Sequence, residues 1–267
     1  MRIPVQIEKA DRSELLSLIE EICSEYVNEA QKCAYVSAET EIQNMLSDKS
    51  LNQFLAVCKA IAITLKGMDI EYIEIFGTED KIDELSRRMQ CWIILGSATE
   101  TALQIFLAIY LADYNNSSWK QWQNFNYEEV KSSFFNILDE AVVNGHIEQQ
   151  NAKSLKNGIK KQLQSKINMP TIYKLTLKEL VNFYNRQVGW DKEMIDNLDF
   201  IRKNRNCVHS FQEREIGTWE ELFSSIKFFC ALVSELVAMT PDVDDYLSIE
   251  AEMRAEYEAE IMADMDY

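Results

Sequence analysis

The scarcity of glycine and proline constrains the fold of this chain more than any other feature of its sequence. Among 267 residues there are seven glycines and three prolines. A chain with so few turn-forming residues makes few tight turns, and it has no glycine-rich loop of the kind that cradles phosphate groups. Long helices joined by short connections are expected, so the sequence predicts an all-α fold built as a bundle of long helices.

Capping signals and apolar periodicity locate these helices. Three segments have the form of a capping box, in which a Ser, Thr or Asp precedes a Glu by three residues, and each is followed by apolar residues at helical spacing. The run 70–76 is too short for periodicity to decide between a strand and a helix. The boxes are Asp11-x-x-Glu14, Thr176-x-x-Glu179 and Thr218-x-x-Glu221, and helices are predicted at about 12–35, 50–67 and 92–110, after Thr176, and at 219–239. Asn126-x-x-Glu129 is a further cap and predicts a helix that reaches Val142, and the lysine-rich helix that follows ends at about Ile167.

Three regions follow from these patterns. Residues 1–78 form a helical N-terminal region without a catalytic signature. Residues 79–240 hold the most apolar predicted helix and are expected to form a helical bundle. Residues 241–267 carry ten acids against the single Arg254, which predicts an acidic C-terminal helix or tail.

Missing motifs exclude several chemistries. The six cysteines are widely spaced without a C-x-x-C pair, and the two histidines are distant, so neither a zinc site nor another metal site is expected. The sequence lacks a P-loop, a G-x-G-x-x-G and an H-E-x-x-H, which argues against the chemistries that depend on these motifs. A Ser-His-Asp triad stays open, although no nucleophile elbow is present. Without a signal peptide or a run of 18 apolar residues, the chain is expected to be cytoplasmic, with reduced thiols and no membrane association.

The charge of the chain is unevenly distributed. The formal net charge is −17, which by itself argues against a nucleic-acid enzyme. However, the segment between Glu148 and Glu179 has no acid and contains seven lysines. It predicts either a basic track for RNA, with Lys156, Lys160 and Lys161 as phosphate ligands, or a simple solvated helix face.

One stretch, residues 198–211, brings cationic, amide and imidazole side chains together at helical spacing. In a continuous helix, Arg202 and His209 return almost to the same line, and Arg205 and Asn206 lie on the same polar stripe. Arginine offers donors that match phosphate oxygens, and histidine exchanges a proton near neutral pH, so together they could bind and cleave a phosphodiester. The alternative is that these side chains form salt bridges or cap the helix. His146, the other histidine, lies in a polar turn where exposure is expected.

The same stretch resembles the motif of the HEPN superfamily, all-α domains found in many RNA-cleaving toxins and defence proteins. The family motif separates an Arg from a His by four to six residues, and Arg202 and His209 have six between them. Arg205 is one residue too close to His209 and is therefore interpreted as a second phosphate ligand, while Ser210 stands where glycine often follows the histidine. The resemblance covers roughly 89–240, and only 198–211 is specific.

A second segment adds to this resemblance. The sequence pattern Leu-Gly-Ser-x-x-Glu-x-x-Leu at 95–103 is similar to that of the first long helix of HEPN domains. Glu100 is a lone acid in this apolar run. It is interpreted either as an exposed residue on the far face or as a supporting acid that pairs with one of the motif arginines.

The resemblance implies an HEPN-like helical bundle and metal-independent endoribonuclease activity, in a toxin or defence effector. His209 would act as general base on a ribose 2′-hydroxyl or as acid to the leaving oxygen, and Arg202 would stabilise the phosphorane charge. Arg205 and Asn206 would orient the phosphate. Since RNA itself would supply the nucleophile, the resemblance implies no cofactor. The implied partners are RNA, a second copy meeting the chain across the motif helix, and an antitoxin or regulatory protein. The alternative is a non-catalytic HEPN protein that binds RNA, a nucleotide or a partner protein.

The acidic tail suggests regulation. A partial apolar stripe predicts a helix from about Asp245 to Met262 that can dock on the protein. One hypothesis is that its acids lie near Arg202, Arg205 or the lysine segment and compete with RNA, and the alternative is that the tail serves solubility.

Overall fold

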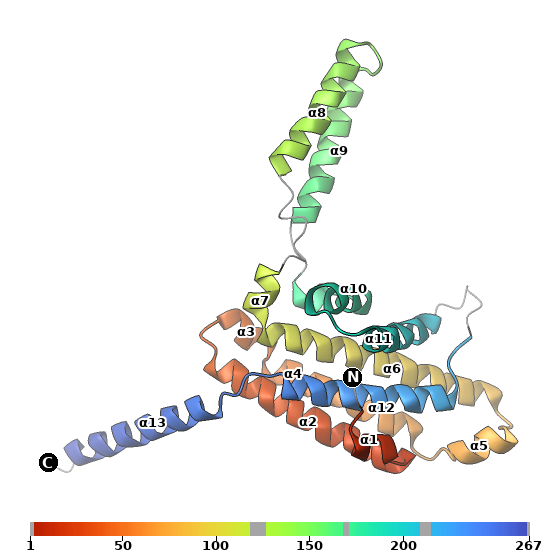
Figure 1. The fold of residues 1–267 in the computed structure, drawn as a ribbon, viewed down its shortest axis with the longest axis vertical. Coiled ribbons are helices and arrows are strands. Elements are labelled where there is room, and N and C mark those ends of the chain that lie inside the picture. Colours follow the sequence, from red (N-terminus) through yellow and green to blue (C-terminus); the bar gives the residue numbers. More distant parts are fainter. Residues whose placement is uncertain (1–2, 118–126, 168–170, 209–214, 266–267) are drawn as a thin grey trace.

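The protein is an all-α bundle, as the sequence predicts. The computed structural model describes residues 3–117, 127–167, 171–208 and 215–265. Within these ranges the chain forms helices and no strand (Figure 1).

Helix α6 (Lys81–Ile109) is the centre of the bundle. Helices α2 (Arg12–Val36), α4 (Asp48–Leu65) and α12 (Trp219–Ala238) pack along one side of it, and α10 (Leu177–Phe183) and α11 (Lys192–Arg205) along the other (Figure 1). Because α6 is covered on both sides, it is apolar around much of its circumference. It is long and apolar enough to cross a membrane, but most of its apolar stretch is buried inside the bundle, as in the core helix of a globular protein.

Short helices connect and flank these long ones. Near the N-terminal half they are α1 (Val5–Lys9), α3 (Thr40–Met45), α5 (Ile70–Phe76) and α7 (Leu111–Asn116). The segment 70–76, which periodicity left undecided, is therefore helical. Around α10 and α11 lie the 3-10 turn η2 (Ile172–Lys174), the π-helical turn η3 (Tyr184–Val188) and the 3-10 turn η4 (Asn206–Val208).

The predicted capping boxes start three of the helices. In each, the cap side chain accepts the backbone N–H of the glutamate, whose own carboxylate accepts the backbone N–H of the cap residue. They are Asp11 with Glu14 in α2, Thr176 with Glu179 in α10, and Thr218 with Glu221 in α12.

The N-terminal region shares its core with the rest of the bundle. The Tyr26 ring packs edge-on against Phe54, and the Tyr26 hydroxyl donates to the carbonyl oxygen of Ala102 in α6 at 3.0 Å. Trp92 of α6 and Phe229 of α12 are buried in the same cluster. The predicted boundary near residue 78 thus falls in the connection between α5 and α6 and does not separate two cores.

Helices α8 (Tyr127–Val143) and α9 (Gln149–Ile167) form an antiparallel hairpin, here called the arm, that projects from the bundle (Figure 1). The sequence predicts both helices and includes them in the bundle of 79–240, whereas in the structure they pack against each other and project from it. An apolar periodicity shows that a helix has a face to bury, but not which element covers it. The predicted cap at Asn126 lies outside the described residues.

The C-terminal segment is helical, as predicted, in α13 (Asp244–Met265). Its described contacts are with α2, where Lys32 Nζ lies 2.8 Å from Asp244 Oδ1 and the Tyr35 hydroxyl lies 3.3 Å from Glu250 Oε1. No described contact joins it to α11 or to the arm, so the structure does not place the described acids of the tail beside the motif arginines.

The six cysteines are free thiols, all within the described residues, and only Cys207 is not fully buried. Burial raises the pKa of the Cys91 thiol to about 12. The Cys91 thiol is therefore a poor nucleophile.

Candidate functional site

Helix α11 presents the motif residues at its C-terminal end. Asp191 caps its N-terminus by accepting the backbone N–H of Met194 at 2.8 Å through Oδ1, and the helix buries Leu198 and Ile201 against the bundle. The buried stripe fixes the rotation of α11, because residues one turn apart share a face. The basic residues of its last turn consequently lie at the edge of α6 and toward solvent.

The α-helix ends at Arg205, although the sequence predicts a continuous helix through His209. The backbone N–H of Asn206 approaches the carbonyl oxygens of Arg202, Lys203 and Asn204, and the chain tightens into η4. Asparagine side chains compete with the backbone for hydrogen bonds and disfavour a helix interior, which accounts for the early end. His209 lies outside the described residues.

Arg202 is held by a carboxylate on its own helix. Its Nη2 lies 2.6 Å and its Nε 2.7 Å from Oδ1 of Asp199, one turn earlier, and Lys203 Nζ lies 2.9 Å from Oδ2 of the same residue. Partial burial works to raise the pKa of Asp199, but the hydrogen bonds from Lys203 and Arg202 outweigh it and leave the pKa below its ordinary value. Asp199 is therefore ionised near neutral pH and neutralises part of the positive charge here.

Arg205 turns toward the bundle instead. Its Nη1 lies 2.6 Å from Oε2 of Glu100 on α6 and its Nη2 lies 3.4 Å from Oε1, so the predicted pairing of Glu100 with a motif arginine is present. Oε2 also accepts the backbone N–H of Leu177, at the start of α10, at 2.6 Å. Glu100 thus joins three helices, and the Arg205 guanidinium is engaged in that junction.

Gly96 makes room for this junction. A Cβ atom added to Gly96 would lie 2.7 Å from both Cβ and Cδ of Arg205, too close for any real contact. The stem of Arg205 therefore lies directly on the backbone of α6. This packing explains why a small residue stands at position 96, one turn before Glu100.

Asn204 is the residue of this region that sequence reasoning missed. It is only 5% exposed, its Oδ1 accepts the backbone N–H of Gly217 at 2.7 Å, and its Nδ2 donates to the carbonyl oxygen of Phe200 at 3.1 Å. It ties the end of α11 to the segment that leads into α12. The sequence contains a signal for this role. Position 204 continues the buried stripe of Leu198 and Ile201, and a buried amide needs hydrogen-bond partners.

A pocket of about 770 Å³ lies where the end of α11 meets the start of α12. Arg202, Lys203 and Asn206 contribute to one wall, and Glu215 and Glu221 to the other. The structure thus brings Arg202 and Asn206 together, as predicted, but Arg205 does not line this pocket. Opposed charges around a partly open cavity suit a ligand that bears both anionic groups and hydrogen-bond donors.

The predicted lysine ligands lie elsewhere, on the arm. Lys156 Nζ lies 2.6 Å from Oδ1 of Asp139 and 5.1 Å from the centre of the Phe135 ring, so it braces the hairpin. Lys160 and Lys161 are exposed on α9. None of the three lines the pocket at the end of α11, so the structure does not assemble one site from the lysines and the motif residues.

Two further observations bear on chemistry. In the part of the chain that the structure describes, no three His, Cys, Asp or Glu side chains are grouped as metal ligands. His146 is exposed in the turn between α8 and α9, as expected.

Comparison with known proteins gives no assignment. No protein-family model matches the chain, and neither the curated proteins nor the solved structures contain a match.

Proposed function

We propose that this protein is a metal-independent endoribonuclease of the HEPN type. The observation that carries the proposal is the pocket at the end of α11, where Arg202 and Asn206 share a wall. His209 follows Asn206 by three residues in the sequence. A cation, an amide and an imidazole are the groups that phosphodiester transesterification needs, and their order matches the motif that the sequence resembles.

The proposed reaction uses RNA as its own nucleophile. His209 removes the proton of a ribose 2′-hydroxyl, the 2′-oxygen attacks the adjacent phosphorus, and the bond to the 5′-oxygen breaks as that oxygen takes up a proton. The products are a 2′,3′-cyclic phosphate and a 5′-hydroxyl. Neither water nor a cofactor is consumed, and Arg202 stabilises the charge that develops on the phosphate oxygens.

The ion pair of Arg202 with Asp199 gives this site a resting state. A phosphate oxygen can accept from Arg202 only by replacing Asp199, which lies 2.6 Å from Nη2. Both side chains are partly exposed, so the exchange costs little. Arg205 contributes indirectly, since its contact with Glu100 fixes the end of α11 against α6.

The biological setting belongs to the same proposal. An RNA-cleaving protein of this kind would act as a toxin or defence effector, and a second copy meeting α11 across a two-fold axis would complete the cleft. An antitoxin or regulatory protein would then hold the activity in check.

Replacing Arg202 tests the assignment. We expect Arg202→Ala to lower cleavage of RNA by about a hundredfold to a thousandfold, the range that loss of one charge-stabilising donor causes, without loss of helical content. The matched control is Lys192→Ala, which removes a charge from the exposed first turn of the same helix. Equal cleavage by the Arg202→Ala protein and the wild type would remove Arg202 from the mechanism.

A non-catalytic RNA- or partner-binding protein is the second candidate. It is favoured by one observation: both motif arginines are paired with carboxylates, Arg202 with Asp199 and Arg205 with Glu100. Such a protein would bind RNA in a salt-dependent manner and release no product. Binding measured beside cleavage distinguishes the two candidates.

A further inference from the structure

The arm carries apolar side chains that its own two helices do not cover. No residue of α8 is buried, and Ala152 is the one buried residue among the described side chains of the arm. Phe134 is 45%, Ile137 62% and Leu155 49% exposed. A helix hairpin of this length needs to bury such a face against a further element, because two helices alone form no enclosed core.

On α8, the exposed apolar residues lie opposite the charged edge. The contact of Lys156 with Asp139 marks one edge of the hairpin. Phe134 and Ile137 precede Asp139 by five and two residues. At about 100° per residue, they lie about 140° and about 200° around the α8 axis from Asp139, counted in the same direction. Both therefore emerge on the other side of the hairpin.

On α9, Leu155 lies on that same side. The buried Ala152 shows which line of α9 faces α8. Lys156 is displaced from this line by about 40° in one direction and Leu155 by about 60° in the other. Since Lys156 marks the Asp139 edge, Leu155 lies with Phe134 and Ile137 on the opposite side, here called the apolar arm face.

The apolar arm face is uncharged and includes a glycine. Gly158 follows Leu155 by three residues, and a Cβ added there would meet nothing within 4 Å. A glycine on an open helix surface lets another helix backbone approach closely. Over residues 130–141 of α8 and 151–162 of α9, the positions that lie on this side by helical geometry are uncharged: Val130, Phe134, Ile137 and Ala141, and Asn151, Leu155, Gly158 and Gln162. By the same geometry, Lys166 continues this line toward the end of α9.

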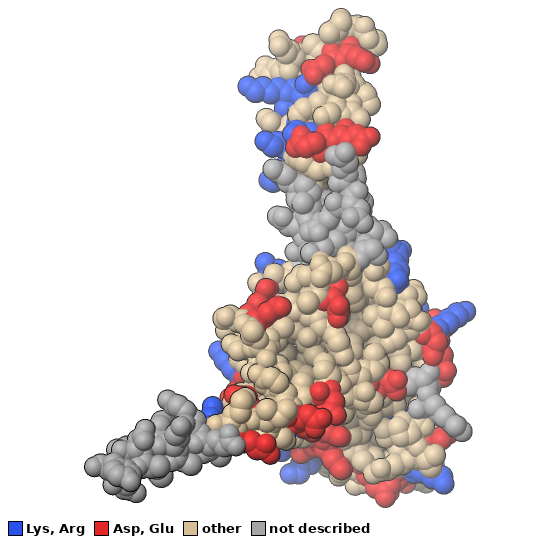
Figure 2. Space-filling model, turned by 60° about the vertical axis from the view of Figure 1, so that its left-hand side comes forward, with Lys and Arg blue, Asp and Glu red and all other residues tan. Residues whose placement is uncertain are grey.

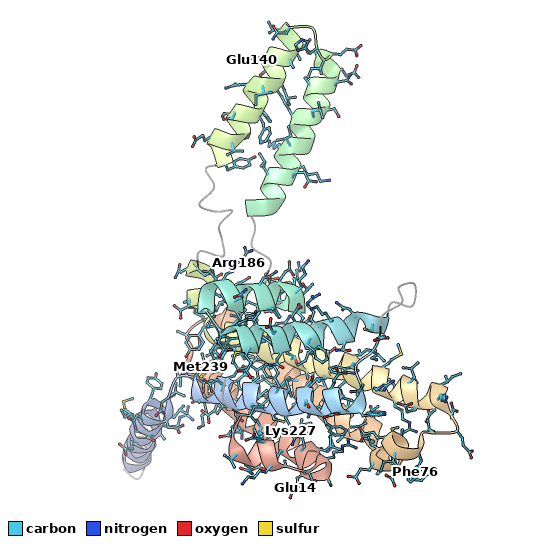
Figure 3. All side chains as sticks on the ribbon, turned by 45° about the vertical axis from the view of Figure 1, so that its right-hand side comes forward. Glu14, Phe76, Glu140, Arg186, Lys227 and Met239 are labelled. Carbon is cyan, nitrogen blue, oxygen red and sulfur yellow. The ribbon has the colours of Figure 1, made fainter. Side chains whose placement is uncertain are left out.

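The charges of the arm are separated between its two helices. Helix α9 contains five lysines and no acid, whereas α8 contains four acids and one lysine. Figure 2 shows lysine side chains along one edge of the arm, and in Figure 3 the acidic Glu140 lies near its tip. Two arms related by a two-fold axis parallel to the helices would set the acidic α8 of each across from the basic α9 of the other.

We propose that two copies of this chain associate through their apolar arm faces and form a four-helix bundle. Identical uncharged faces meet without repulsion, whereas the rest of a chain with a net charge of −17 repels its own copy. The charges of the two arms are complementary, because the acidic α8 of each copy packs against the basic α9 of the other. The proposal does not depend on ribonuclease activity, and it concerns a different surface from α11.

The face has the size of a modest interface. Helices of 17 and 19 residues present a surface about 25 Å long and about 20 Å wide. Two such faces bury about 1,000 Å² in total, which is below the range of standard stable interfaces and in the range of weak, transient ones. The expected dimer therefore dissociates on dilution.

The test is the mass of the full chain in solution, measured by sedimentation equilibrium over a range of concentrations. We expect the wild type to self-associate and Ile137→Glu to weaken the association by at least about tenfold, because a charge would enter the centre of the interface. Any contact through α11 is the same in both proteins, so the difference between them reports on the arm alone. Since Ile137 is largely exposed in the single chain, helical content should not change. The matched control is Asn136→Glu, which adds the same charge one residue away at an exposed position on the other side of α8 and should leave the dimer intact.

A mixing experiment tests the arrangement of the two arms. Leu155→Lys should also weaken self-association, and a mixture of the Ile137→Glu and Leu155→Lys chains should associate more tightly than either variant alone, because α8 of one copy faces α9 of the other. A monomeric wild type at every concentration, or a dimer indifferent to Ile137→Glu, would overturn the proposal. Failure of the two variants to associate with each other would overturn the pairing of α8 with α9.

Discussion

Glu100 connects three helices near the site through hydrogen bonds of its carboxylate. Its carboxylate, carried by α6, accepts from Arg205 of α11 and from the backbone N–H of Leu177 at the start of α10. Short charge-assisted hydrogen bonds at a partly buried position contribute more than surface ion pairs do. The position of Arg205, and with it the end of α11, depends on this one side chain.

Glu100→Ala should therefore lower the free energy of unfolding by about 1–3 kcal/mol, because a partly buried guanidinium and a backbone N–H lose their acceptor. Denaturant unfolding of the full chain measures the change. Glu71→Ala is the control, since Glu71 is an exposed acid on α5, and its replacement should change the stability by less than about 0.5 kcal/mol. If the two variants are equally stable, the junction contributes nothing.

Some side-chain contacts of this region could be predicted from the sequence and others could not. A lone acid in an apolar run is conspicuous, so the pairing of Glu100 could be inferred from sequence alone. The pairing of Arg202 with Asp199 could not, because a charged residue one turn away on a polar face has several possible partners. The partner of Asn204 could not be inferred either, because its acceptor oxygen binds the backbone of Gly217, 13 residues away in the sequence.

Among the elements, the contact between α11 and α12 shapes the pocket. Asn204 accepts the backbone N–H of Gly217, and the indole N–H of Trp92 on α6 donates to the Gly217 carbonyl at 3.3 Å. A Cβ at position 217 would lie 2.7 Å from the Trp92 ring, so only glycine fits there. The backbone N–H of Gly217 is thus satisfied by a side chain of α11, and its carbonyl oxygen by a side chain of α6.

Asn204→Ala should cost about 1–3 kcal/mol of stability, because it leaves the buried N–H of Gly217 without its acceptor. It should also lower RNA cleavage, since the two walls of the pocket are no longer tied together. Calorimetry and the cleavage assay measure these effects. Asn197→Ala, which removes an amide at a half-buried position of the same helix outside the pocket, should change both far less. A stable and fully active Asn204→Ala protein would show that the tie does not shape the pocket.

The long helices could be predicted because their signals are local. The helix predicted at about 12–35 is observed at Arg12–Val36, and the one predicted at 219–239 at Trp219–Ala238. The end of α11 and the position of the arm depend on competing hydrogen bonds and on the partner that covers each face. Neither appears in the periodicity of a single segment.

For the whole molecule, the distribution of charge determines where an acidic protein could bind RNA. The described contacts of α13 are on α2, the lysines are on α9, and the pocket lies at the end of α11. The sequence shows that acids and lysines are segregated, but it does not show where the folded chain puts them. Because the net charge is −17, RNA would be attracted by local groups only, and binding should fall steeply with salt.

Cleavage of RNA in the presence of EDTA, with the chemistry of the new ends determined in the same reaction, tests the central proposal most directly. The wild-type chain should cleave and leave 2′,3′-cyclic phosphate and 5′-hydroxyl ends. His209→Ala should lose this activity, whereas His146→Ala, which changes the exposed histidine of the arm, should retain it. Absence of cleavage by the wild type, complete inhibition by EDTA, or equal cleavage by the His209→Ala protein would contradict the account.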